Sequence, residues 1–187
     1  LPAKKDWKNI YHLVILPTYQ EGGSLIRESI DALLESDYPK EKMIVVLATE
    51  NRAGKEHQEI AAEIEREYKD KFSTFMVTHH PSDVIGEVAG KGSNVAWAGK
   101  EAQKLLNSLN IPYEDVIISS FDIDTKVYKQ YFACLTWYYL TEENPKKASY
   151  QPIPVYNNNI WKAAFFTRIV ATSNTFWQMI QQERLEK

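Results

Sequence analysis

Two aspartates at alternate positions, Asp122 and Asp124, are the residues of this chain whose type and spacing best suit chemistry. They follow an apolar run at 116–118 that has the pattern of a buried strand. In extended backbone, side chains at i and i+2 lie on one face, about 6.6 Å apart. Such a carboxylate pair needs a cation or strong donors, and Mg²⁺ or Mn²⁺ held together with substrate phosphates would meet that need. The alternative is that Asp124 caps a helix beginning near Thr125 while Asp122 faces water.

A second set of candidates follows two earlier apolar runs, at 13–16 and 43–47. Pro17 ends the first run, and after it Tyr19 offers a ring on which a base can stack and Glu21 an acceptor for base or sugar. Glu50 follows the second run and could accept from a base N–H or a ribose hydroxyl, as the acidic residue of dinucleotide folds does. The alternative is an ordinary Gly-terminated loop with exposed side chains.

Lys91 lies between two glycines, Gly90 and Gly92, before an expected helix. The segment is not a Walker motif, because only three residues separate Gly86 from Gly90 and a glycine follows the lysine. A lysine at a helix N-terminus is still suited to contact a diphosphate, because the amides, the dipole and the ammonium all favour an anion. A flexible loop with a solvated lysine is the alternative. The sequence contains no GxGxxG motif for a nicotinamide dinucleotide.

Alternating strands and helices must position these residues. Strands are expected at 13–16, 43–47, 72–78 and 116–118, and helices at 24–34 with Ser24 as cap, at 55–71 and at 93–109 with Ala96 facing inward. This order predicts an α/β fold with a mostly parallel, doubly wound sheet and helices on both faces. Ligands of such sheets bind beyond the carboxyl ends of the strands. After Tyr150 the alternation ends, and a long aromatic helix is expected at 160–187.

Three remaining features favour structural roles. His79 and His80 are expected in a loop, with side chains pointing apart. Cys134, the only cysteine, has a helical apolar pattern around it and is expected to be buried. The C-terminal aromatic residues are expected to pack in the core, with a membrane surface or an acceptor groove as alternatives; they are Trp161, Phe165, Phe166, Phe176 and Trp177.

Composition excludes several classes of protein. The 187 residues include 22 Lys and Arg against 25 Asp and Glu, a formal net charge of -3, so no basic footprint for nucleic acid is present. The 44% of hydrophobic residues, with 7 Gly and 8 Pro, excludes disordered and collagen-like chains. No uninterrupted apolar run of about 18 residues occurs, so this piece is expected to be soluble. The first residue, Leu1, and the charged run at 182–187 favour an excised piece of a longer protein.

Taken together, these segments resemble the family 2 glycosyltransferases, which have the GT-A nucleotide-sugar fold. The run at 17–21 is similar to the Pro-x-Tyr-Asn-Glu of that family, Glu50 lies near its uracil-contacting acid, the run at 90–94 is similar to its Gly-Lys-x-x-Ala-Leu-Asn region, and the run at 122–124 is similar to its DXD motif. Order and spacing agree over residues 10–125. Departures are Gln20 in place of Asn, and Ala48-Thr49-Glu50-Asn51 in place of Asp-Asp-Gly-Ser.

The resemblance implies an inverting, metal-dependent glycosyltransferase that takes its sugar from a nucleoside diphosphate, UDP above all. Pro17, Tyr19, Glu21 and Glu50 would hold the nucleoside and Lys91 the diphosphate. Asp122 would contact ribose or a metal-bound water, and Asp124 would coordinate Mg²⁺ or Mn²⁺. Gln151, before Pro152, is similar to the acceptor-side Gln-x-Pro segment of the synthase-like members, which are membrane proteins.

The resemblance also implies what lies outside this chain. The acidic base motif and the Gln-x-x-Arg-Trp segment of the family follow the acceptor region, so the general base is expected beyond Lys187. Residues 1–187 are then a single nucleotide-sugar-binding domain, incomplete at its C-terminus and possessing no complete catalytic set. The acceptor would be a glycan or a lipid-linked sugar, and the parent protein would lie at the cytoplasmic face of a membrane. Two other interpretations remain: a non-catalytic nucleotide-sugar-binding domain, and a sugar-nucleotidyltransferase.

Overall fold

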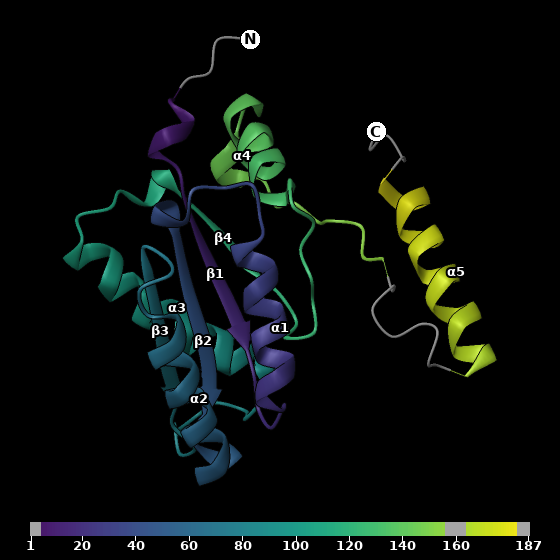
Figure 1. The fold of residues 1–187 in the computed structure, drawn as a ribbon. Coiled ribbons are helices and arrows are strands. Elements are labelled where there is room, and N and C mark those ends of the chain that lie inside the picture. Colours follow the sequence, from purple (N-terminus) through teal and green to yellow (C-terminus); the bar gives the residue numbers. More distant parts are fainter. Residues whose placement is uncertain (1–4, 156–163, 183–187) are drawn as a thin grey trace. The chain divides into compact units, whose positions relative to one another are not determined.

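The computed structural model describes residues 5–155 and 164–182. The chain divides into two compact units, residues 1–146 and 147–187, and each is described by itself. In the first unit four parallel strands form one sheet in the order β3-β2-β1-β4 (Figure 1). The strands are β1 (Tyr11–Pro17), β2 (Met43–Glu50), β3 (Thr74–His80) and β4 (Val116–Ser120). The α-helices of this unit are α1 (Gly23–Leu34), α2 (Lys55–Tyr68), α3 (Lys91–Ser108) and α4 (Tyr131–Thr141). The short 3-10 turns are η1 (Trp7–Asn9), η2 (Lys40–Lys42), η3 (Asn51–Ala53), η4 (Tyr113–Asp115) and η5 (Pro145–Lys147).

The sheet carries a hydrophobic core on each face. On one face Ile30 of α1 and Ile64 of α2 pack against Val45, and Phe132 of α4 joins the same cluster. On the other face the cluster belongs to α3, whose Ala98, Ala102 and Leu106 recur every four residues and pack against side chains of β1 and β2. All eight residues of β2 are buried, because layers lie on both of its faces. The predicted α/β fold with a parallel sheet and helices on both faces is confirmed.

The ends of several elements differ from the sequence-based expectation. Gly22, not Ser24, is the N-cap of α1, and no side-chain hydrogen bond caps this helix. The third strand begins at Thr74, and α3 begins two residues earlier than expected, at Lys91. Ala96 is exposed, because it lies off the stripe that α3 turns toward the sheet. Several short polar residues near the start of a helix can each serve as its cap, so the sequence pattern does not determine the first residue of the helix.

Two expectations about single side chains are wrong. Cys134 is exposed on α4, because that helix turns Phe132, Leu135 and Tyr139 toward the core and Cys134 lies off their face. His79 and His80 are not in a loop but end β3. Their side chains do point apart, since His79 is exposed and His80 is buried.

In the second unit the described helix is α5 (Phe165–Gln182), within the range expected to be helical. The hydroxyl of Thr175 donates to the carbonyl of Pro154 at 2.9 Å, which joins α5 to the segment before it. Contrary to expectation, four of its aromatic side chains are more than half exposed: Phe165, Phe166, Phe176 and Trp177. One helix and a short segment offer too little surface to enclose them. The fifth residue of that set, Trp161, lies outside the described residues.

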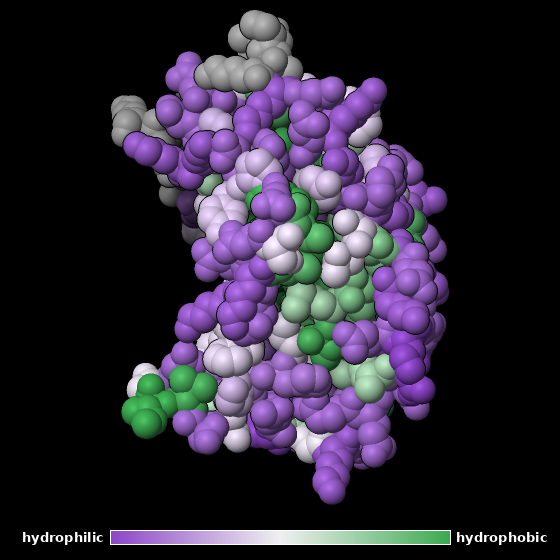
Figure 2. Space-filling view, turned by 90° about the vertical axis from the view of Figure 1, so that its left-hand side faces the viewer, coloured by the Kyte–Doolittle hydropathy of each residue, from purple (hydrophilic) through white to green (hydrophobic). Residues whose placement is uncertain are grey.

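One face of the molecule is largely polar (Figure 2). Hydrophilic side chains cover most of the face in Figure 2, with hydrophobic side chains gathered in a smaller patch among them. None of the helices in the described part of the chain combines the length and the apolar character needed to cross a bilayer.

Candidate nucleotide site

The candidate site lies where the chain reverses its direction across the sheet. From β1 the chain proceeds outward to β2 and β3, and then returns to place β4 on the other side of β1. The loops that follow β1 and β4 therefore diverge, and open parallel sheets bind ligands at such a switch point. Because all four strands are parallel, their carboxyl ends meet at this edge, the lower end of the sheet in Figure 1. The predicted residues Tyr19, Glu21, Glu50, Asp122 and Asp124 all follow or end strands here.

The loop after β1 is folded around the carboxylate of Glu21. Pro17 is the buried last residue of β1, and the amide of Thr18 then donates to the carbonyl of Ala48 at 2.9 Å. Oε2 of Glu21 accepts from the amide of Tyr19 at 2.6 Å and from the hydroxyl of Thr18 at 2.8 Å. Burial acts to raise the pKa of Glu21, but these hydrogen bonds outweigh it and the pKa is lowered. Glu21 is thus an ionised residue that shapes the loop holding Tyr19.

His57 of α2 contacts the same loop. Its Nε2 lies 3.4 Å from the hydroxyl of Thr18. Burial lowers the pKa of His57, and the nearby charge of Glu21 only partly opposes that effect. A neutral imidazole therefore packs beside Thr18 at pH 7. The sequence did not single out His57, because it lies 39 positions from its partner.

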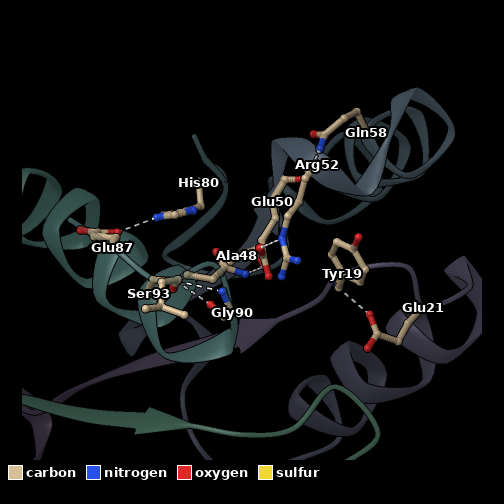
Figure 3. Close-up of polar contacts among 12 residues, drawn as sticks. Tyr19, Glu21, Ala48, Glu50, Arg52, Gln58, His80, Glu87, Gly90 and Ser93 are labelled. Carbon is tan, nitrogen blue, oxygen red and sulfur yellow. Dashed lines mark hydrogen bonds and ion pairs between the residues drawn. The ribbon is translucent and has the colours of Figure 1, made fainter. Parts of the chain in front are cut away.

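Glu50, the last residue of β2, is joined to Tyr19 through Arg52. The side chain of Glu50 is 5% exposed, and its Oε2 accepts from Nε of Arg52 at 2.5 Å. The guanidinium carbon of Arg52 lies 4.5 Å from the centroid of the Tyr19 ring, in a cation–π contact. The hydrogen bond with Glu50 raises the pKa of Arg52. Figure 3 shows the guanidinium between Glu50 and Tyr19. Sequence reasoning missed Arg52, although its position two residues after Glu50 was a usable signal.

The start of α3 is fixed against the end of β2. The side-chain amide of Asn94 donates to the carbonyl of Ala48 at 2.8 Å, and the amide of Gly90 donates to the hydroxyl of Ser93 at 3.2 Å (Figure 3). These bonds place Lys91 at the carboxyl edge of the sheet. Its Nζ donates to Oδ1 of Asp122 and forms an ion pair with it. Two residues predicted separately, 31 positions apart, are therefore in contact.

Asp122 and Asp124 follow β4 on backbone that has left the strand. Phe121 and Ile123 are buried while both aspartates are exposed. That the two carboxylates lie on one side stays a prediction. The amide of Thr125 donates to the carbonyl of Asp122 at 2.8 Å, which closes a turn. No helix begins near Thr125, since α4 starts only at Tyr131, so the interpretation of Asp124 as a helix cap is wrong.

The pair has the chemistry of a partial metal site. Within residues 5–155 and 164–182, no group of three or more His, Cys, Asp or Glu side chains is arranged to hold a metal ion. Two exposed carboxylates, however, fit an ion such as Mg²⁺ that completes its coordination with water and ligand phosphates. The residues present fit a metal brought in with a diphosphate better than one held by protein alone.

The loop between β3 and α3 is anchored beside this edge. Nε2 of His80 lies 2.9 Å from Oε2 of Glu87 (Figure 3). The ring of His80 also meets that of Trp97 edge to face. Lys100 adds a longer ion pair with Glu87, at 3.8 Å. His80 thus has a structural contact in the described fold.

Gln151 belongs to the second unit, where its amide donates to the carbonyl of Pro152 at 3.3 Å.

No model of a known protein family matches this chain, and no curated protein does either. Among solved structures, S. aureus TarS 1-349 aligns with a TM-score of 0.49 and 20% identity, over 70% of this chain and 32% of that one. The same protein in complex with UDP-GlcNAc gives 0.46 and 21%, over 70% and 31%. The mannosyltransferase PcManGT from Pyrobaculum calidifontis, in complex with GDP-Man and Mn²⁺, gives 0.43 and 24%, over 75% and 37%. This chain therefore spans about a third of the length of these structures.

Proposed function

We propose that this chain is the donor-binding part of a GT-A glycosyltransferase of family 2 that takes its sugar from UDP. The observation that carries the proposal is the contact between Lys91 and Asp122. It brings the cation at the start of α3 and the carboxylate after β4 together at the switch point of the sheet. A diphosphate and its metal need both kinds of group at one place.

The nucleoside would lie on the loop after β1. Tyr19 offers the ring for stacking, and Glu50 offers a carboxylate for a base N–H or a ribose hydroxyl. Glu21 holds the Tyr19 loop through its internal hydrogen bonds, and its ionised state lets it accept from the ligand as well. Pro17 ends β1 so that the loop leaves the sheet at this point.

The diphosphate would lie between Lys91 and the aspartates. Asp124 and Asp122 would hold Mg²⁺ or Mn²⁺. Asp124 would coordinate the metal, and Asp122 would contact either a metal-bound water or the ribose. The metal would supply Lewis-acid stabilisation of the departing nucleoside diphosphate. Lys91, at a helix N-terminus, would add positive charge next to the phosphates.

The transfer itself would proceed with inversion. The acceptor hydroxyl forms a new bond to the anomeric carbon while the bond to the diphosphate oxygen breaks and its electron pair leaves with the nucleotide. The hydroxyl proton passes to a general base, which we place beyond Lys187. Gln151 would belong to the acceptor side, the acceptor would be a glycan or a lipid-linked sugar, and the parent protein would act at the cytoplasmic face of a membrane.

Isothermal titration of UDP in the presence of Mn²⁺ tests the donor site. Asp122→Ala and Asp124→Ala should each weaken Mn²⁺-dependent binding by about tenfold or more, the effect of losing a metal-linked contact worth about 1.4 kcal/mol. Asp70→Ala is the matched control, because Asp70 is an exposed aspartate that precedes β3, away from the carboxyl edge. If both site variants bind UDP and Mn²⁺ as the wild type does, the metal site is wrong. Hydrolysis of UDP-GlcNAc by this chain would show instead that it contains its own base.

A further inference from the structure

Arg52 makes the two interactions that a nucleobase would make in the proposed site. A base there would place its planar face on the Tyr19 ring and donate an N–H to the Glu50 carboxylate. The guanidinium of Arg52 is itself planar and rich in N–H donors, and it lies on that ring at 4.5 Å while donating to Oε2 of Glu50 at 2.5 Å. Figure 3 shows it in the space between the two residues.

Burial shows which member of the ion pair is the outer one. The side chain of Glu50 is 5% exposed, whereas that of Arg52 is 37% exposed. The amide of Gln58 fixes the backbone at Glu50, donating to its carbonyl at 2.9 Å. Glu50 is therefore held at the end of a buried strand, and Arg52 covers its bonded oxygen from the solvent side. A ligand can reach that oxygen only after the guanidinium moves.

The segment that carries Arg52 is suited to such a movement. Arg52 lies in η3, a single 3-10 turn of three residues between β2 and α2. The turn ends at Gly54, whose φ of +94° is open to glycine and costly for other residues. The side chain of Arg52 leaves this turn toward the site, so a change of its rotamers uncovers both Tyr19 and Glu50 without disturbing the sheet.

We propose that Arg52 holds the place of the base in the nucleotide-free protein and competes with it, so that this residue sets the affinity and the selectivity of the site for nucleosides. The proposal rests on the proposed function, because it takes Tyr19 and Glu50 as the nucleoside contacts. When the base enters, the guanidinium exchanges Glu50 for solvent. Ligands without a base do not meet this competition.

The test compares Arg52→Ala and Arg52→Lys with the wild type by isothermal titration of UDP, GDP and inorganic pyrophosphate, each with Mn²⁺. If Arg52 covers the site for about 90% of the time, its removal strengthens binding of the nucleotides by about tenfold. Pyrophosphate affinity should not change. Arg52→Lys keeps a cation beside Glu50 but lacks the planar group, so a smaller gain is expected, and it guards against a folding defect in the alanine variant. Arg66→Ala, on the exposed surface of α2, is the matched control.

The outcomes separate this proposal from the one on which it rests. If UDP and GDP bind the wild type but bind Arg52→Ala equally or more weakly, Arg52 is not a competitor of the base. An equal gain for pyrophosphate also overturns the proposal, because the effect would then be one of charge. If neither the wild type nor Arg52→Ala binds any of the nucleotides, the proposed function itself is wrong.

Discussion

Acidification should destabilise the first unit through His12, a residue of β1 enclosed on every side. His12 has no exposed surface, its Nε2 lies 2.8 Å from the hydroxyl of Thr136, and the rings of Tyr38 and Phe132 lie 4.5 and 4.9 Å from its own. Burial lowers the pKa of His12 to about 3, although a hydrogen bond from the imidazole to the backbone of Phe132 opposes the shift.

The size and sign of the effect follow from these pKa values. The unfolded chain binds a proton at His12 near pH 6.5, and the folded chain binds it only near pH 3. Between these values the unfolded state holds more protons, so the free energy of unfolding falls as the pH falls. From pH 7 to pH 4.5 the loss from His12 alone is about 2.5 kcal/mol. That is a large part of the stability of an ordinary domain, which is about 5–15 kcal/mol.

Urea unfolding followed by circular dichroism at pH 7 and pH 4.5 measures this loss. His12→Gln removes the titrating group at similar size, so the variant should lose about 2.5 kcal/mol less than the wild type between the two pH values. Carboxylates such as Glu21, whose pKa is lowered, lose their contribution below pH 4.5 in both proteins and cancel in the comparison. Thr136→Val, which keeps the buried ring, should retain the full pH dependence. Equal losses in the wild type and His12→Gln would refute the reasoning.

Four further predictions concern other parts of the first unit. Phe132→Ala should lower the free energy of unfolding by about 3–5 kcal/mol in urea titrations, because this side chain is fully buried among four aromatic rings, and a loss below about 1 kcal/mol would contradict that packing. Cys134 is exposed, so a thiol reagent such as DTNB should modify the folded protein as fast as it does the urea-unfolded chain, within a few fold; full protection would place the residue in the core. Lys91→Ala should weaken UDP binding in the presence of Mn²⁺ yet change the stability by less than about 1 kcal/mol, because both members of its ion pair are more than half exposed. Gly54→Ala should cost about 1 kcal/mol in the same unfolding assay, since its φ is +94° while the space around it is open, and an unchanged stability would show that the turn relaxes.

Helix α4 shows why the sequence does not always reveal which face of a helix is buried. The helix has apolar or aromatic residues all around it, so its pattern does not identify one buried face. The fold turns Phe132 and Tyr139 inward and leaves Trp137 and Cys134 exposed. Only the position of the neighbouring strand and helix decides between faces that are equally apolar. For α1 the apolar residues do form a single stripe, and Ile26, Ile30 and Leu33 of that stripe are buried.

The sequence by itself determined the local features of this protein. The apolar runs with helical segments between them were enough for the α/β class, since a run that is apolar at every position, such as the one at 43–47, must be covered on both faces. The alternation of Asp122 and Asp124 with Phe121 and Ile123 likewise indicated which side chains are exposed, since both aspartates are exposed and both apolar residues are buried.

The tertiary structure alone decided which of these residues meet. The strand order β3-β2-β1-β4 places the loops after β1 and β4 at one switch point, and no local pattern encodes that order. The contact of Lys91 with Asp122 and the contact of Arg52 with the Tyr19 ring join segments that are far apart along the chain. Such contacts depend on how whole elements pack, whereas hydrophobic periodicity records only the environment of each residue along its own helix or strand.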